Sequence, residues 1–208
     1  MRKLTGVLFM LLGLSLVLGS LFLFMKNRRE DQTARTFTDS VIPVLQEEIR
    51  QTRQTVPAET SPDLTENIPA EYLTPEDLIM TEKIINGYGY IGYLTIPDLG
   101  LELPVMSGWD SARLQISPCR FTGSLRGEDL VLMAHNFSSH FGRLSQLSMG
   151  AQVQFMDMDG NLWNYQVVAM DVLPAEALEE MTAGEYDLTL FTCATNRAHR
   201  VTVRCNKS

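Results

Sequence analysis

Three side chains able to react with a carbonyl group stand at the ends of apolar, strand-like runs in this chain of 208 residues. Cys193 ends the run 188–193, His135 follows a second run, and Arg200 begins a third. A thiol can attack a carbonyl carbon, an imidazole can move a proton, and a guanidinium can hold an oxyanion. The three residue types together predict a site for nucleophilic attack on a carbonyl.

The alternation of side chains along a strand decides which of these groups can meet. On the first run Cys193 shares a face with Phe191, and on the third run Arg200 lies on the polar face, opposite the apolar one. A hairpin that joins the two runs through residues 194–199 would place Arg200 beside Cys193. The spacing permits this pair, although Arg204 on the same face competes with Arg200.

The residues around these positions resemble one known family. Residues 189–193, TLFTC, resemble the TLxTC signature of the sortases, the cysteine transpeptidases of Gram-positive cell surfaces. Residues 134–136 are similar to the family's GH segment, with Ala134 in place of the usual glycine. Arg200 falls where the family places its catalytic arginine, and the resemblance spans roughly residues 88–206.

The resemblance implies a role for each matching residue. Cys193 is the implied nucleophile, His135 the proton carrier and Arg200 the cation that holds the oxyanion. Thr192 matches a substrate-contacting threonine, and we assign Asn136 to substrate binding as well. Without the surrounding motif each residue would have a more ordinary interpretation. A lone cysteine at a strand end, for example, is more often a buried apolar residue.

Other residues of the same types are not assigned to the site. Arg197 also competes with Arg200, but the resemblance favours Arg200. His140 and His199 are interpreted as surface residues.

The subclass of sortase stays open. Residues 135–137 and the Phe141-Gly142 pair are similar to class B and related clostridial sortases.

The chain from residue 88 onward predicts a mainly β fold. Many short strand-like runs separated by turn residues are typical of a barrel or sandwich. The resemblance implies a closed sortase-type barrel of about seven to eight strands with short helices. The expected strands are 89–96, 101–106, 130–135, 151–156, 162–172, 187–193 and 200–205, with short helices at 139–147 and 175–181 and a hairpin turn at 157–161.

Residues 4–25 carry no charge and predict a membrane anchor, because about 20 apolar residues cross a bilayer. The weak cleavage-like motif at 18–20 favours an uncleaved anchor over a signal peptide. Basic residues flank both ends, so charge does not decide the orientation. The resemblance implies an extracellular catalytic domain. We expect three parts: an anchor (1–29), an acidic, proline-containing stalk (30–84) and a catalytic barrel (85–208).

The stalk is expected to contain a helix from an N-cap at Ser40 to about Gln54. Its acidic excess, twelve acidic against four basic residues, and five of the nine prolines are typical of a spacer. An active-site lid of the kind found in pilus-building sortases is disfavoured, because the Asp-Pro-aromatic element of such lids is absent. The loop 174–186 is implied to help select the sorting motif.

Charge and cysteine content exclude other classes. A net charge of −8 argues against a nucleic-acid partner. No Cys-x-x-Cys or His-x-x-x-His spacing supports zinc, and no metal or other cofactor is expected. The chain has three cysteines, so one stays free if Cys119 and Cys205 form a disulfide.

The sequence therefore predicts a membrane-anchored sortase. It would cleave an LPxTG-like sorting signal of a surface protein through a thioacyl group on Cys193. An amine of a peptidoglycan precursor or a pilin lysine would then take the acyl group. A surface cysteine endopeptidase that uses water, and a non-catalytic membrane-tethered barrel, are the alternatives.

Overall fold

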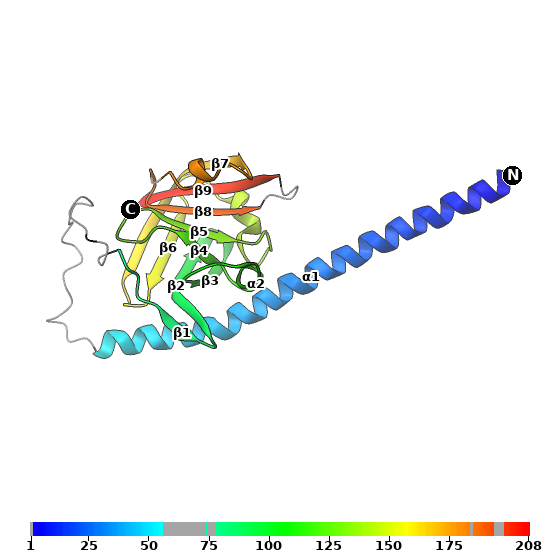
Figure 1. Ribbon diagram of the computed structural model, residues 1–208. Coiled ribbons are helices and arrows are strands. Elements are labelled where there is room, and N and C mark those ends of the chain that lie inside the picture. Colours follow the sequence, from blue (N-terminus) through cyan, green and yellow to red (C-terminus); the bar gives the residue numbers. More distant parts are fainter. Residues whose placement is uncertain (1, 56–73, 75–77, 184, 194–197) are drawn as a thin grey trace.

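A computed structural model describes residues 2–55, 74, 78–183, 185–193 and 198–208. One long helix leads into a β-barrel with short helical turns (Figure 1). The helical elements are α1 (Arg2–Thr55), η2 (Pro97–Leu99), α2 (Ser111–Leu114), η3 (Phe141–Gln146) and α3 (Leu178–Met181). The strands are β1 (Lys83–Ile85), β2 (Tyr88–Ile96), β3 (Leu101–Met106), β4 (Cys119–Thr122), β5 (Leu130–Ala134), β6 (Gln152–Asp157), β7 (Leu162–Pro174), β8 (Leu188–Cys193) and β9 (His199–Lys207).

The N-terminal half of α1 carries the apolar segment and projects away from the barrel (Figure 1). Its large apolar side chains are exposed, for example Phe9 at 72% and Phe22 at 68%. By length and composition α1 could cross a membrane, with a mean hydropathy of 2.0 in its apolar window. The apolar surface left open here is the kind that a bilayer covers.

The helix predicted to begin at Ser40 does not begin there. α1 runs without a break from the apolar segment to Thr55, and the Ser40 hydroxyl donates a 2.7 Å hydrogen bond to the Phe37 carbonyl within the helix. Because the helix is already formed before it reaches Ser40, this serine caps nothing and bonds to the preceding turn instead. The apolar segment and the predicted stalk helix are therefore one continuous helix.

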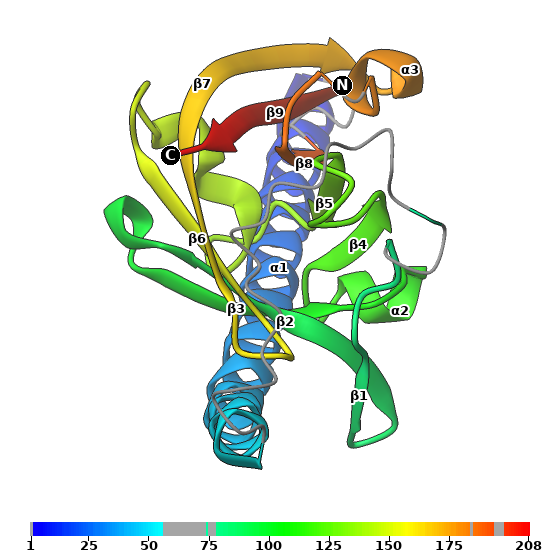
Figure 2. The same cartoon turned by 90° about the vertical axis from the view of Figure 1, so that its left-hand side faces the viewer.

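The strands form a closed barrel, as predicted. They pair in the order β1-β2-β3-β4-β5-β8-β9-β7-β6, and a further pairing of β2 with β6 closes the ring of eight strands and leaves β1 at its edge (Figure 2). Gly92 makes this closure possible, because its φ is 145° and an added Cβ would collide with the Met156 carbonyl oxygen. Only glycine allows so close an approach of two backbones.

All seven predicted strands are present, with ends shifted by a residue or two. The strands β1 and β4 were not predicted, because three or four residues are too few to show a clear alternation. The hairpin turn at 157–161 joins the antiparallel strands β6 and β7. The two predicted short helices are shorter than expected, and correspond to η3 and α3.

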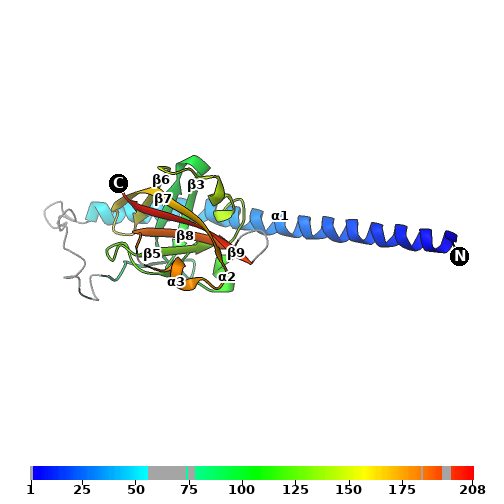
Figure 3. The same ribbon diagram turned by 90° about the horizontal axis from the view of Figure 1, so that it is seen from above.

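The C-terminal half of α1 lies along the outside of the barrel (Figure 3). A stripe of apolar side chains on the helix packs on the outer faces of β2 and β3, against Tyr90 and Met106. Val41 and Leu45, in the centre of this stripe, have no exposed surface. Full burial of such side chains contributes about 1.5–3 kcal/mol each, so the helix is part of the folded domain.

Substitution of Leu45 by alanine should lower the free energy of unfolding by about 2–5 kcal/mol, because it leaves a cavity between α1 and the barrel. Val44→Ala is the matched control, since Val44 lies next in the same helix and is 42% exposed. Denaturant unfolding of both variants tests this. Equal stability of the two would show that the α1–barrel contact contributes nothing.

Candidate active site

The register of three neighbouring strands brings the predicted site residues to one edge of the barrel. β5 and β8 run parallel, with Ala134 opposite Thr192, so His135 and Cys193 are the next residues at the same end. β8 and β9 are antiparallel, with Cys193 opposite Arg200. The expected pairing of the last two strands is thus present.

The outer face of β5 and β8 is covered rather than open to solvent. Val131, Met133 and Phe191 form a small apolar cluster there with Met181 of α3. The alternate residues of the same strands face the barrel interior, where Leu132 and Leu190 belong to the main core. Cys193 belongs to the same row of its strand as Phe191, which places its position at the end of the outer cluster.

Arg200 lies over this outer cluster. Its guanidinium carbon is 5.4 Å from the centre of the Phe191 ring, a distance at which a cation is attracted to an aromatic face. The Nε of Arg200 also donates a 3.3 Å hydrogen bond to the Ala175 carbonyl, in the segment that leads into α3. These contacts hold a permanent positive charge beside the position of Cys193.

The competing arginine has a structural role. Arg204 is 4% exposed, and it donates to the carbonyl oxygens of Met181 and Glu180 and to the Thr189 hydroxyl. These bonds fasten α3 to β8 and β9 at a position four residues further along β9 than Arg200. Arg197, the other competitor, lies outside the described residues.

His135 begins a tight turn. The Phe141 backbone N–H donates to the His135 carbonyl at 3.2 Å, and the imidazole lies 5.0 Å from the ring of Phe137. Phe137 is 5% exposed, so it forms a fixed apolar wall for the half-buried imidazole. An added Cβ at Gly142 would collide with the carbonyls of Asn136 and Phe137, so the turn requires glycine there.

The prediction that His140 lies on the surface is wrong. The turn after His135 folds His140 beneath the loop, where it has no exposed surface. Burial, with the nearby His135 as a lesser cause, lowers the pKa of His140 to about 4. A neutral, enclosed imidazole of this kind is no proton carrier near neutral pH.

The two residues predicted to bind substrate differ in exposure. The Thr192 hydroxyl is buried and donates a 2.6 Å hydrogen bond to the Ala134 carbonyl, which ties β8 to β5 directly before Cys193 and His135. Asn136 is exposed beside His135. The Thr192 side chain therefore fixes the two strand ends, and Asn136 is the one of the pair that is open to solvent.

Cys119 and Cys205 are both free and buried, and no disulfide joins them. They cannot pair because Cys119 belongs to the cluster under α1, whereas Cys205 belongs to the barrel interior. Burial raises the pKa of each thiol to about 12. Both are therefore protonated and unreactive at neutral pH, since the thiolate is the nucleophile.

A row of aromatic rings, which no sequence pattern predicts, lies beside the site. Trp109 stacks on Phe121 with ring centres 5.6 Å apart, and Phe121 meets Phe191 edge-on at 5.4 Å. Trp109 remains 49% exposed, so the row runs from solvent to Arg200. Phe121 belongs to the short strand β4, and no sequence pattern linked it to Phe191. Among the described residues, no three His, Cys, Asp or Glu side chains are grouped to hold a metal ion.

Comparison with known proteins gives the class. The family model described as Sortase domain matches residues 94–208, more than half of the chain. The protein belongs to the sortase family of cysteine transpeptidases. No curated protein matched the sequence.

Solved sortase structures share the fold. Sortase C of Clostridium perfringens SM101 is 23% identical, with a TM-score of 0.59 over 81% of this chain and 98% of that one. Sortase C of Streptococcus pneumoniae is 23% identical, with a TM-score of 0.58 over 80% and 96%. Sortase C1 of Streptococcus suis is 28% identical, with a TM-score of 0.51 over 57% and 73%. Identities at this level do not assign a subclass.

Arg200→Lys should leave the fold intact and lower the rate of acyl transfer by roughly 100-fold, because an ammonium on a flexible stem cannot reproduce a fixed guanidinium. Arg204→Lys is the contrasting variant, expected to lower the melting temperature more than the rate, since it loosens α3. Steady-state kinetics and thermal unfolding of both variants distinguish them. The reverse pattern would exchange the roles of the two arginines.

Proposed function

We propose that this sortase cleaves an LPxTG-like sorting signal of a surface protein and transfers the released acyl group to an amine. The observation that carries this proposal is the register of β5, β8 and β9, which aligns His135, Cys193 and Arg200 at one barrel edge. The family supplies the reaction class, and these three residue types supply the parts that the reaction needs.

In the first half-reaction the Cys193 thiolate attacks the carbonyl carbon of the scissile peptide bond. The tetrahedral oxyanion forms beside Arg200, whose fixed charge stabilises it. The carbon–nitrogen bond breaks as His135 gives its proton to the leaving amine. The products are a thioester on Cys193 and the released C-terminal part of the sorting signal.

In the second half-reaction an incoming amine attacks the thioester. His135, now neutral, accepts the proton of that amine, and the Cys193 thiolate leaves as the new amide bond forms. The acceptor class is an amine of a peptidoglycan precursor or a pilin lysine. Asn136, exposed beside His135, is proposed to contact substrate, as is the backbone at Thr192, whose hydroxyl is already bonded.

Arg200 also bears on the protonation of the pair. With ordinary pKa values near 8.5 for a thiol and 6.5 for an imidazole, only about 1% of the pair is the reactive thiolate–imidazolium form. A permanent cation next to the thiol favours the thiolate and so enlarges this fraction. The cation therefore acts before the attack as well as during it.

The protein is proposed to be anchored by residues 4–25, with the barrel on the outer surface of the cell. The support is the long apolar helix and the cell-surface setting of sortases. Surface proteins that carry a sorting signal meet the enzyme there, because their own exported chains emerge at the same membrane. No nucleic acid, metal or other cofactor enters this reaction scheme.

Protease treatment of intact cells should degrade the barrel and leave a small membrane-embedded stub that contains the apolar half of α1. The expectation rests on an anchor that stays uncleaved and a barrel that faces outward. Immunoblotting with an antibody against the C-terminal strand measures the loss of the barrel, and an N-terminal epitope tag measures the stub, with a cytoplasmic protein as the control for intact cells. Full protection of the barrel would contradict the outward orientation.

The transfer reaction is tested with the full chain in detergent, LPxTG-like peptides and an oligoglycine acceptor. We expect a mass adduct on Cys193 that is absent from Cys193→Ala and that converts into an amide product when the amine is added. Without an acceptor, the thioester should be hydrolysed more slowly than it is transferred when the amine is present, since a thioester reacts readily with amines. Cleavage that ignores every amine in the panel would favour the endopeptidase, and binding without an adduct would favour the tethered barrel.

A further inference from the structure

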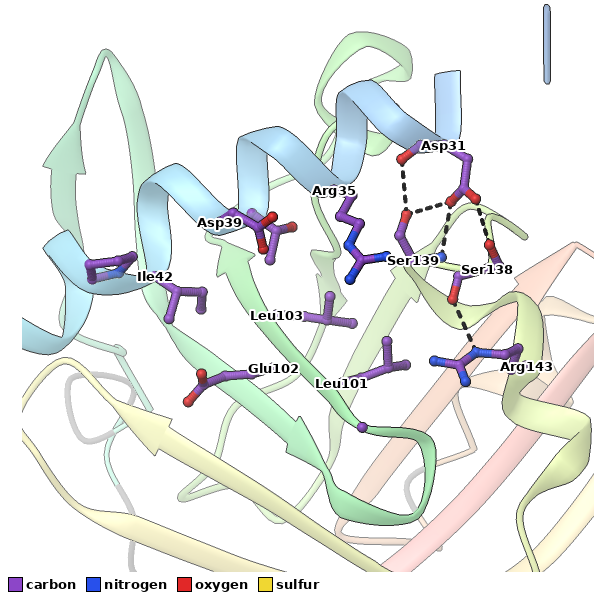
Figure 4. Close-up of a pocket in the computed structure, with 13 residues that line it drawn as sticks. Asp31, Arg35, Asp39, Ile42, Leu101, Glu102, Leu103, Ser138, Ser139 and Arg143 are labelled. Carbon is purple, nitrogen blue, oxygen red and sulfur yellow. Dashed lines mark hydrogen bonds between the residues drawn. The ribbon is translucent and has the colours of Figure 1, made fainter. Parts of the chain in front are cut away.

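Asp31 of α1 joins the membrane-proximal end of the docked helix to the turn that follows His135 (Figure 4). Its carboxylate accepts hydrogen bonds of 2.5 Å from the Ser138 hydroxyl, 2.5 Å from the Ser139 hydroxyl and 2.9 Å from the Ser139 backbone N–H. The Ser139 hydroxyl also lies 3.3 Å from the Asp31 carbonyl. Asp31 thus binds two successive residues that lie more than a hundred positions later in the chain.

The same turn is held from its other side by Arg143. The Nε of Arg143 donates to the Ser138 carbonyl at 3.1 Å, and its terminal nitrogen donates to the Leu99 carbonyl at 2.6 Å. The turn is therefore clamped between α1 and the β2–β3 connection. Hydrogen bonds to a charged partner are about twice as strong as those between neutral groups, so both clamps are of the stronger kind.

The turn transmits this clamp to His135. The backbone N–H groups of His140 and Gly142 both donate to the Phe137 carbonyl, at 3.0 and 2.9 Å, and Phe141 donates to the His135 carbonyl. Phe137, fixed in this way, presents its ring to the imidazole at 5.0 Å. A displacement of Ser138 and Ser139 would move Phe137 and with it the wall against which the imidazole lies.

The ionised state of Asp31 suits this role. Partial burial by itself raises the pKa of Asp31, but the hydrogen bonds from Ser138 and Ser139, with a smaller contribution from His140, outweigh it and the pKa is lowered. The carboxylate is thus charged at neutral pH and can accept from all three donors at once.

Resting on the proposed function, we propose that Asp31 is a positioning residue for His135, so that the membrane anchor helix is itself part of the catalytic apparatus. Asp31 lies six positions after Met25, the last residue of the apolar segment, and this spacing is about 9 Å along a helix. The histidine turn is therefore fixed close to the membrane by the element that crosses it. Detachment of α1 from the barrel releases the turn and lowers the rate without touching a reacting atom.

The test uses the full chain in detergent with three variants. Asp31→Ala removes the acceptor, Asp31→Asn keeps one acceptor oxygen, and the double variant Ser138→Ala, Ser139→Ala removes two donors while α1 is unchanged. Asp39→Ala is the matched control, because Asp39 is exposed on the same helix and lines the same cavity. Thermal unfolding verifies that each variant is folded.

Two readouts separate positioning from a general loss of structure. Asp31→Ala and the double serine variant should lower kcat by about 10- to 100-fold with little change in the KM for the peptide, as expected for a misplaced proton carrier. Asp31→Asn should be intermediate. In histidine-labelled protein the Hε1 NMR signal of His135 should shift, because the imidazole leaves the ring current of Phe137.

The NMR readout needs no substrate, so it decides the inference even if the wild-type protein transfers no peptide and the proposed function fails. The proposal would be overturned by an unchanged His135 signal in the folded double serine variant. It would also be overturned if the control Asp39→Ala lowered kcat as much as Asp31→Ala does. If Asp31→Ala does not fold, the Asp31→Asn and double serine variants carry the same comparison.

Discussion

The parallel pairing of β5 with β8 is the constraint on which the site depends. Parallel strands end at the same edge of a sheet, so the residues that follow Ala134 and Thr192 necessarily emerge side by side. Antiparallel β9 then returns to that edge and begins at Arg200. A parallel pair needs a long crossover, and the segment between the two strands supplies it with η3, β6, β7 and α3. A slip of one residue in this register would move the row of β8 that contains Cys193 from the outer face of the barrel to its interior.

The barrel alone does not complete this arrangement. Its interior is filled by the alternate residues of the strands, whereas the outer faces need separate cover. α1 covers the outer faces of β2 and β3, and α3 covers those of β5 and β8 through Met181. The two helices contact different parts of the site. Arg204 fastens α3 beside Arg200, and Asp31 fastens α1 to the turn after His135.

The parts that the sequence predicted well were those with a local signature. The apolar runs 130–134 and 188–193 are long enough for alternation to define their faces, and the motif around Cys193 pointed to the family. The roles of Cys193, His135 and Arg200 remain predictions, although their placement at one edge agrees with what those roles require.

What the sequence could not predict depends on contacts between distant segments. The interaction of Asp31 with Ser139 joins positions 108 apart, and no periodicity marks an aspartate in the middle of a helix for such a role. The burial of His140 follows from a turn closed by backbone hydrogen bonds, which composition does not reveal. Ser40 was interpreted as a cap because a local pattern cannot show that the helix has already begun upstream.

Selective alkylation is the most direct test of the claim that one thiol carries the chemistry. The folded full chain is treated with iodoacetamide near neutral pH, and the modified residues are mapped by mass spectrometry while transfer activity is followed. We predict modification of Cys193 alone, with activity lost in parallel, because burial raises the pKa of Cys119 and Cys205 to about 12 and leaves them protonated. Full activity with Cys193 alkylated, or activity lost through modification of Cys119 or Cys205 in the folded protein, would contradict the account.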